Sequence, residues 1–120
     1  MAAMIGRLYN IVIDCPDPSS LAEFYGELLG LKVQQDEDAW VTIGDDRPRV
    51  AFQLAPDLRP PRWPDPQRPQ QLHLDVLVDD IDEAERQVLA LGATRLPGDG
   101  DDFRVYADPA GHPFCLVWHD

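Results

Sequence analysis

The stretch ELLGLKV at positions 27–33 returns as LALGATR at positions 89–95. In each stretch an apolar helical pattern ends at a glycine, and a strand-like run follows. The same shift of 62 residues, which is 89 minus 27, places the strand end AFQL on PFCL. A repeat of this kind predicts that the chain is built from two copies of one structural unit.

The first copy predicts a strand, a helix and three further strands. The run LYNIVI at 8–13 favours a strand, because β-branched and aromatic residues are enriched in strands. Leucines and aromatic residues at helical spacing predict a helix that stops at Gly30, with Ser20 and Glu23 as its capping box. The strands expected after this helix are 31–35, 39–43 and 49–54.

The second copy repeats this order. The run LHLDVLV at 72–78 favours a strand, and the next helix is expected to start at the capping pair Asp80 and Glu83 and to stop at Gly92. The apolar residues that share one face of this helix are Ile81, Ala84, Val88 and Leu91. The strands expected after it are 93–96, 103–107 and 112–118.

A proline-rich segment separates the two copies. Positions 56–69 hold six of the twelve prolines, and proline removes a backbone donor, so no core strand is expected there. We therefore expect one domain over 1–120, made of module one at 7–55, this linker, and module two at 70–120. Trp63 lies in the linker, where it either packs on the domain surface or forms a flap over a pocket.

The composition predicts a soluble globular domain with a strong acidic balance. Hydrophobic residues make up 44% of the chain, and 22 acidic against 10 basic residues give a net charge of -12. This charge repels phosphate backbones and anionic lipids and attracts cationic ligands, so neither nucleic acid nor a membrane is an expected partner. Because no transmembrane run or signal peptide pattern is present, we expect a cytoplasmic protein.

Strand alternation assigns several polar side chains to the face that points away from the helices. In the strand after the linker, apolar residues alternate with His73 and Asp75, which therefore share the other face. The same alternation leaves Asn10, Gln53 and Cys115 on that face in the first and last strands of the modules. If the two sheets form one curved surface, these side chains converge on a shared cleft.

Most of these residues have more than one interpretation. His73 and Asp75 are either a hydrogen-bonded pair that lines the cleft or a general base with its partner. Cys115 is a small apolar core residue, a thiolate ligand for zinc or another soft ion, or a redox or nucleophilic thiol. The aromatic residues that form either pocket walls or core are Trp40, Phe103 and Tyr106. The other two histidines, His112 and His119, are expected to be solvated.

Three longer stretches resemble a known family. They are FYGELLGLKV at 24–33, HLDVLVDDIDEA at 73–84 and VYADPAGHPFCLV at 105–117. Together with the paired βαβββ modules, they resemble the vicinal oxygen chelate superfamily, which includes glyoxalase I, bleomycin-resistance and fosfomycin-resistance proteins, extradiol dioxygenases and methylmalonyl-CoA epimerase. The resemblance covers almost the whole chain, and its ending is similar to small glyoxalase-like proteins of unassigned activity.

This resemblance implies an α+β fold and an assembly. The two βαβββ modules are expected to form a curved eight-stranded mixed sheet around a cleft, with the helices on the outer face. Homodimers are frequent in the superfamily, so the resemblance also implies a homodimer.

The resemblance also implies a set of metal positions. Metal-dependent members hold a divalent ion with four ligands, and by register these positions fall on Asn10, Gln53, His73 and Cys115. The candidate ligands are His73, Gln53 and Cys115, and Cys115 replaces the carboxylate that resembles the catalytic base of glyoxalase I. A Lewis-acid isomerase needs a base and charge to hold the ion, and this set contains no carboxylate. Two alternatives therefore stay open: the protein uses no cofactor, or it binds one divalent metal ion.

Three functions follow from the resemblance and the residues. The first is a metal-independent, resistance-type protein that binds a cationic small molecule in the cleft, and the second is a divalent-metal-dependent lyase, isomerase or dioxygenase. The third is a degenerate member that acts as a structural or regulatory partner. Whether the protein is an enzyme stays open, with His73 and Asp75 as the catalytic candidates. The residues expected to bind the ligand are Asn10, Trp40, Gln53, His73, Asp75, Phe103 and Cys115.

Overall fold

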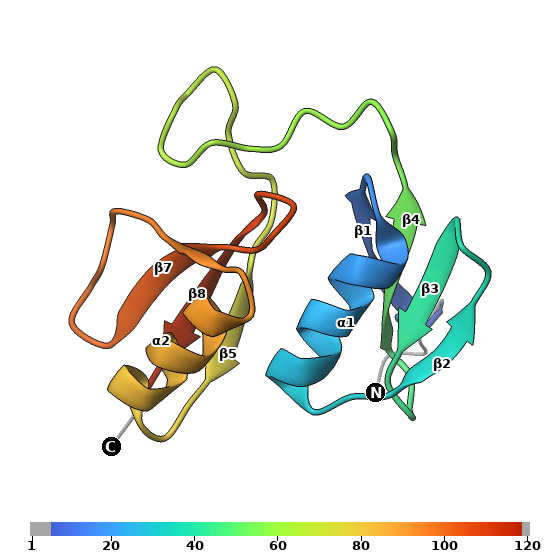
Figure 1. Ribbon diagram of the computed structural model, residues 1–120, viewed down its shortest axis with the longest axis horizontal. Coiled ribbons are helices and arrows are strands. Elements are labelled where there is room, and N and C mark those ends of the chain that lie inside the picture. The colour runs from blue at the N-terminus through green and yellow to red at the C-terminus, as the bar shows by residue number, and fades with distance from the viewer. Residues whose placement is uncertain (1–5, 119–120) are drawn as a thin grey trace. The chain divides into compact units, whose positions relative to one another are not determined.

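The computed structural model describes residues 6–118 (Figure 1). The chain separates into two compact units, with the boundary between Leu58 and Arg59. We call the described residues before this boundary module one and those after it module two. Most of the proline-rich linker therefore belongs to module two, which begins at residue 59 and not at residue 70 as expected.

Module one has the predicted order of strand, helix and three strands. Its sheet has the order β1-β4-β3-β2, in which β1 pairs in parallel with β4 and the other neighbours are antiparallel. The central strand β4 is therefore hydrogen-bonded on both sides. The elements are β1 (Asn10–Cys15), α1 (Pro18–Leu29), β2 (Val33–Asp36), β3 (Trp40–Ile43) and β4 (Arg49–Leu54).

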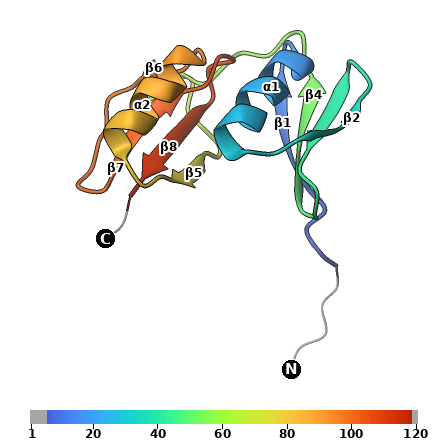
Figure 2. The ribbon, with the colours of Figure 1, turned by 60° about the horizontal axis from the view of Figure 1, so that its bottom comes forward.

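Module two repeats this topology, as Figure 2 shows. Its sheet has the order β5-β8-β7-β6, with β5 and β8 parallel and the other neighbours antiparallel. The repeat of βαβββ units that the sequence predicted is confirmed, and the eight strands lie in two four-stranded mixed sheets. The elements are β5 (Leu74–Leu77), α2 (Ile81–Ala90), β6 (Thr94–Arg95), β7 (Phe103–Ala107) and β8 (Pro113–Val117).

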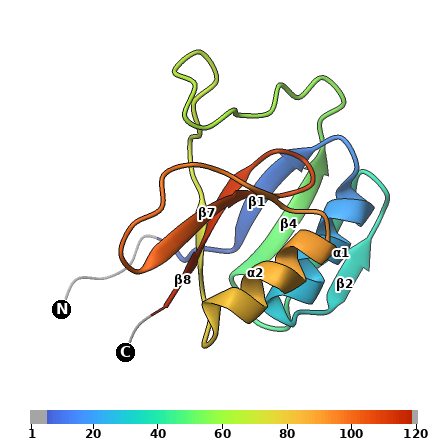
Figure 3. The same ribbon diagram turned by 60° about the vertical axis from the view of Figure 1, so that its left-hand side comes forward.

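Each core lies between one helix and one face of its sheet. In module one Tyr25 of α1 stacks on Phe52 of β4 with their ring centroids 5.7 Å apart. In module two Phe114 of β8 stacks on Tyr106 of β7 at 5.5 Å, on the side of the sheet where Glu85 of α2 accepts a hydrogen bond from Tyr106. Figure 3 shows the backbones of α2, β7 and β8. The other face of each sheet carries no helix of its own module, and we call it the open face of that module.

Three of the four helix ends lie where the sequence predicted them. Helix α2 begins after Asp80, whose side chain accepts from the Glu83 amide, and Gly30 ends α1 in a left-handed conformation with φ of 67°. Gly92 follows directly after the last residues of α2. The Ser20 capping box was wrong, because Asp17 is the N-cap of α1 and accepts from the Ser20 amide at 3.2 Å.

The first strand of each module begins two residues later than the sequence predicted. Tyr9 lies outside β1 and is exposed, and its hydroxyl accepts a hydrogen bond from Arg47 while its ring contacts the Arg47 guanidinium. Leu72 precedes β5 and is also exposed. Strand alternation places Tyr9, Leu72 and Leu54 on the helix-packed faces, and this prediction was wrong because all three side chains are exposed.

The linker forms a loop with its own backbone hydrogen bonds. As the prolines predicted, residues 56–69 contain no helix or strand. The Arg62 amide donates to the Arg68 carbonyl at 2.8 Å, and the Arg68 amide donates to the Asp65 carbonyl at 3.1 Å. Within residues 6–118, neither helix is long or apolar enough to cross a membrane.

The turn between β7 and β8 packs tightly against the start of module two. Gly111 has φ of 100°, and a β-carbon at this position would lie only 2.7 Å from Cβ of Pro60. We expect Gly111→Ala to lower the free energy of unfolding by about 1–3 kcal/mol, because the left-handed backbone is strained in alanine. Equilibrium unfolding in urea measures this loss.

Gly6→Ala is the control for this prediction, since a β-carbon at Gly6 meets no atom within 4 Å. If both variants unfold at the same urea concentration as the parent, the close packing of Gly111 on Pro60 contributes nothing to stability.

Candidate functional site

Three side chains with different donor atoms meet on the open face of module two. Asp75 on β5 lies directly opposite Cys115 on β8, and His73 precedes Asp75 by two residues, which places it on the same side of the chain. Nε2 of His73 lies 3.3 Å from Oδ1 of Asp75. The nitrogen, oxygen and sulfur donors of the three residues all lie within 4.8 Å of one another.

The local surroundings of these donors differ. Side chains of His73 and Asp75 are 39% and 59% exposed, whereas Cys115 is 7% exposed. Burial, followed by the negative charge of Asp75, a hydrogen bond to Asp75 and the charge of Asp99, raises the pKa of the Cys115 thiol to about 11. The thiol is therefore protonated at neutral pH, and the electrostatic potential around it is negative.

One linker residue, Trp63, lies close to this face. Nε1 of Trp63 lies 3.2 Å, and Cγ2 of Val105 3.7 Å, from the position that a β-carbon would take at Gly98. Trp63 is therefore close to Val105, which lies opposite Cys115 in the β7–β8 ladder. Trp63 packs on module two, as one of its two sequence interpretations expected, and it does so on the face that carries the donor group.

Asp99 was not found by sequence analysis. Its Oδ1 accepts a hydrogen bond from the Val105 amide at 3.3 Å, and its other carboxylate oxygen is paired with Arg95. It lies in the loop after the two-residue strand β6, so no strand alternation places it on a face. Its charge nevertheless acts on Cys115, so Asp99 belongs to the electrostatic surroundings of the site.

Phe103 and Tyr106 lie on opposite faces of β7. Phe103 is half-buried on the open face, where it packs against Gly100 and lies opposite Val117. Tyr106 is fully buried on the helix side, so it is core and not a pocket wall. His112 lies in the turn before β8 and is half-buried, and His119 lies outside the described residues.

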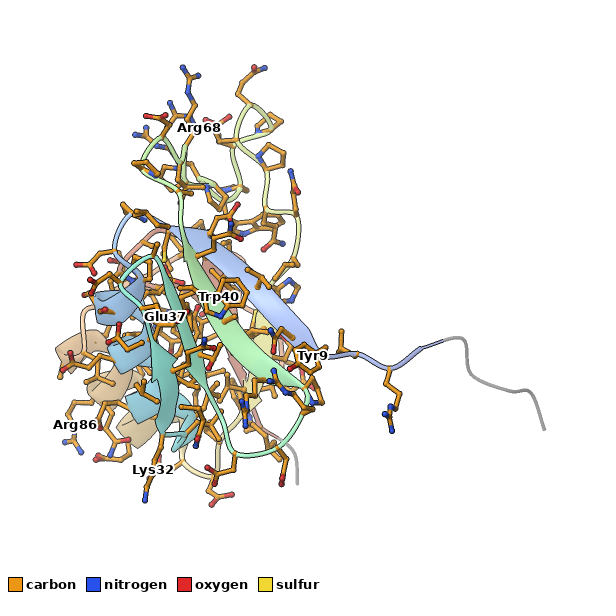
Figure 4. All side chains as sticks on the ribbon, turned by 90° about the vertical axis from the view of Figure 1, so that its right-hand side faces the viewer. Tyr9, Lys32, Glu37, Trp40, Arg68 and Arg86 are labelled. Atoms are coloured by element: carbon orange, nitrogen blue, oxygen red, sulfur yellow. The ribbon has the colours of Figure 1, made fainter. Side chains whose placement is uncertain are left out.

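The open face of module one carries a second group of polar residues. Gln53 on β4 is exposed and lies between Trp40 on β3 and Asp14 on β1, each directly opposite it in the ladder. Figure 4 shows Trp40 on the face of this sheet that is turned away from α1. Gln53 and Trp40 are thus neighbours on this face.

Asn10 does not lie beside Gln53, which corrects the register inferred from the sequence. It pairs with Arg49, four positions along β1 from the Asp14–Gln53 pair, and Oδ1 of Asn10 accepts a hydrogen bond from Arg47 at 2.5 Å. Because the strand rises about 3.3 Å per residue, four positions separate the two sites by roughly 13 Å. The position beside Gln53 belongs to Asp14, which strand alternation places on the same face as Asn10 but which was not among the expected ligand-binding residues.

The arrangement in module two can perform two kinds of chemistry. His73 with Asp75 can act as a general base with its partner, because a neighbouring carboxylate orients the imidazole ring. The three donors can also hold a divalent cation, because imidazole, carboxylate and thiolate are all zinc ligands. The four metal positions that the resemblance implies contain no carboxylate, whereas Asp75, which strand alternation placed on the same face, supplies one here.

Solved structures of similar fold cover nearly the whole chain. A glyoxalase/bleomycin resistance protein/dioxygenase family enzyme from Burkholderia phytofirmans PsJN matches with a TM-score of 0.72 and 17% identity, over 94% of this chain and 98% of that chain. The fosfomycin resistance protein FosX from Mesorhizobium loti matches with a TM-score of 0.71 and 16% identity, over 95% and 92%. A glyoxalase-related enzyme from Fulvimarina pelagi matches with a TM-score of 0.70 and 19% identity, over 96% and 89%. At these identities the likeness shows the fold.

A comparison with the curated proteins gives no match. The family model described as "Glyoxalase-like domain" matches residues 10–117, which includes every helix and strand of both modules. The chain therefore belongs to the glyoxalase-like family, within the vicinal oxygen chelate superfamily.

Proposed function

We propose that the protein binds a small molecule at the open face of module two. The observation that carries this proposal is the meeting of His73, Asp75 and Cys115 donors within 4.8 Å, on a face where two of the three side chains are exposed. Trp63 lies close to Val105, the ladder partner of Cys115, and so adds an aromatic side chain to this part of module two. Gln53 and Trp40 form a second candidate ligand surface, on the open face of module one.

The charge of this face favours a cationic ligand. Asp75 and Asp99 both raise the pKa of Cys115, which means that both place negative potential at the centre of the face. The net charge of -12 adds a long-range attraction for cations. Resistance-type binding of a cationic compound needs neither a base nor a bound metal, and it is the function we put first.

A divalent-metal-dependent lyase, isomerase or dioxygenase is the second candidate. The donor set favours it, because Asp75 supplies the carboxylate that the sequence-based ligand set lacked. His73, Asp75 and Cys115 would hold the ion, which as a Lewis acid polarises a substrate oxygen. His73 and Asp75 are then ligands and not the free acid–base pair.

Substitution of His73 and Gln53 tests the proposed binding site. A screen of cationic drugs and metabolites by thermal shift identifies a ligand, and calorimetric titration then measures its affinity for the variants. We expect His73→Ala and Gln53→Ala each to weaken binding by about tenfold, which is about 1.4 kcal/mol. Both side chains are on open faces, so neither variant should unfold.

Gln87→Ala on α2 is the matched control, since the side chain of Gln87 is exposed and donates a hydrogen bond to Glu83 of its own helix. Unchanged affinity in both His73→Ala and Gln53→Ala would remove the open faces from the binding site.

A further inference from the structure

We infer that the open face of module one carries a site for a carboxylate or phosphoryl group of a small molecule, formed by Thr42, Arg47 and Arg49. Such a group is an oxyanion, and we call these three residues the oxyanion site. The inference goes beyond the proposed function, because none of the three residues belongs to module two. Arg49 also precedes Gln53 by four positions on β4, which separates the two by roughly 13 Å.

Two buried polar atoms without a hydrogen-bond partner point to this site. Among residues 6–118, Oγ1 of Thr42 and Nε of Arg49 are the buried side-chain oxygen and nitrogen atoms in this condition. Such atoms are exceptions in folded proteins, because a buried donor without an acceptor costs free energy. A hydroxyl and a guanidinium N–H can both donate, so one acceptor group that reaches both would satisfy them.

The register of β3 and β4 brings these two residues to one face. Thr42 lies opposite Ala51, and Arg49 precedes Ala51 by two positions, so their side chains are diagonal neighbours on the open face. Diagonal neighbours in an antiparallel pair are about 7–8 Å apart, which is within reach of a long side chain. Thr42 is 2% exposed, so bulk solvent does not reach its hydroxyl. Both unpartnered donors therefore belong to one small part of the sheet.

The positive charges of Arg47 and Arg49 are not paired with a carboxylate of the described residues. None of the ion pairs among residues 6–118 includes either arginine. Arg47 donates to Oδ1 of Asn10 at 2.5 Å and to the Tyr9 hydroxyl at 2.7 Å. Arg49 donates to the backbone carbonyl of Asp45 at 3.2 Å. All of these acceptors are neutral, so they orient the arginines and leave their charge available for an anion.

Asn10 links the two arginines. It lies directly opposite Arg49 in the parallel ladder, and its side chain accepts from Arg47. A guanidinium has five N–H donors, and the bonds described above use two of Arg47 and one of Arg49. The planar fork of the remaining donors matches the paired oxygens of carboxylate and phosphate groups. An oxyanion bound here would receive hydrogen bonds from both arginines and from Thr42.

The oxyanion site differs from a general cationic surface. The net charge of -12 repels anions at long range, so only a local set of donors can hold one. Among the helices and strands of residues 6–118, Arg49 is the one arginine without a carboxylate partner. The others, which all pair with a carboxylate, are Arg86, Arg95 and Arg104.

An NMR titration of the full-length protein tests the site, with inorganic phosphate and acetate as the probes at constant ionic strength. The Nε–H signal of Arg49 is identified by its loss in Arg49→Gln. We expect this signal to shift and to saturate with at least one of the two anions. Tighter binding of phosphate would assign a phosphoryl ligand, and tighter binding of acetate would assign a carboxylate.

Two further variants keep the Arg49 signal and remove the other donors. Thr42→Val and Arg47→Gln should each weaken binding of the tighter anion by about tenfold, since each loses a hydrogen bond to a charged group. Arg47 is exposed, so its variant should keep the fold. Arg86→Gln is the matched control, because it removes the same charge from an exposed position on α2.

Thr42→Val also distinguishes a ligand donor from a structural one. The hydroxyl of Thr42 has no hydrogen-bond partner in the described protein, so without phosphate or acetate the variant should unfold at no lower urea concentration than the parent. A lower midpoint would overturn the inference, because the hydroxyl would then stabilise the fold itself. Failure of both anions to saturate the Arg49 signal, or equal affinity of Thr42→Val, Arg47→Gln and Arg86→Gln, would overturn it as well.

Discussion

Phe114→Ala should lower the free energy of unfolding by about 3–5 kcal/mol, the range for truncating a buried phenylalanine. Phe114 is fully buried at the centre of β8, between Leu74 of β5 and Tyr106 of β7. Its ring stacks on Tyr106 at 5.5 Å, so alanine loses both the buried apolar area and an aromatic pair. Since small domains are stable by only about 5–15 kcal/mol, this is a large share of the total.

Leu77→Ala is the control for Phe114→Ala. Leu77 is a large apolar residue of the same sheet, but it is 65% exposed on β5, and surface substitutions usually change stability by less than about 0.5 kcal/mol. Urea unfolding followed by circular dichroism compares the two variants at an unchanged m-value. A loss below about 1 kcal/mol for Phe114→Ala would contradict the packing of β8 against α2.

Asp108→Ala has the second largest expected effect, a loss of about 2–4 kcal/mol in the free energy of unfolding. Asp108 is 3% exposed, and its Oδ1 accepts hydrogen bonds from the Ala110 amide at 2.8 Å and the His112 amide at 3.0 Å. Removal of the carboxylate leaves two amide donors of the turn without an acceptor. Hydrogen bonds to charged groups are each worth about 1.5–3 kcal/mol, and water replaces part of the loss.

Asp108→Asn separates the hydrogen bonds from the charge. The amide oxygen of asparagine still accepts, so this variant should retain most of the stability that Asp108→Ala loses. Asp101→Ala, at an exposed acid of the same module, should leave stability unchanged within about 0.5 kcal/mol. Equal unfolding midpoints for Asp108→Ala and Asp101→Ala would show that the turn does not depend on this carboxylate.

These results would also explain why the stretch DPAGHPFCL resembles the family so clearly. Asp108 and Gly111 build the turn, Phe114 builds the core, and Cys115 alone of these residues faces the candidate site. The motif that carries the family resemblance is thus mainly structural. It is therefore good evidence for the fold and weak evidence for any particular activity.

The fold could be predicted because its signals are local and repeated. Apolar spacing in the helices and alternation in β4 and β7 are short-range patterns, and both strands begin and end where the sequence placed them. The start of β1 was misplaced because Tyr9 has strand-forming character but binds Arg47, which is 38 residues away. The Ser20 capping box failed because Asp17 precedes Pro18, and proline is favoured in the first helical turn.

The site could be predicted only where strand alternation reaches it. Alternation placed His73, Asp75 and Cys115 on one face, and the structure brings their donor atoms together. It could not place Asp99, which lies in a loop, and the position of Trp63 depends on how the linker folds back on Gly98. The meeting of Gln53 with His73 across the two modules stays a prediction.

A crystal structure grown with zinc, with anomalous data collected at the zinc absorption edge, tests the module-two site most directly. We expect the strongest anomalous peak within about 2.0–2.3 Å of Nε2 of His73, Oδ1 of Asp75 and Sγ of Cys115. A strongest peak among other residues, or no peak at this group in protein saturated with zinc, would contradict the assignment of these three residues as ligands of a divalent metal ion.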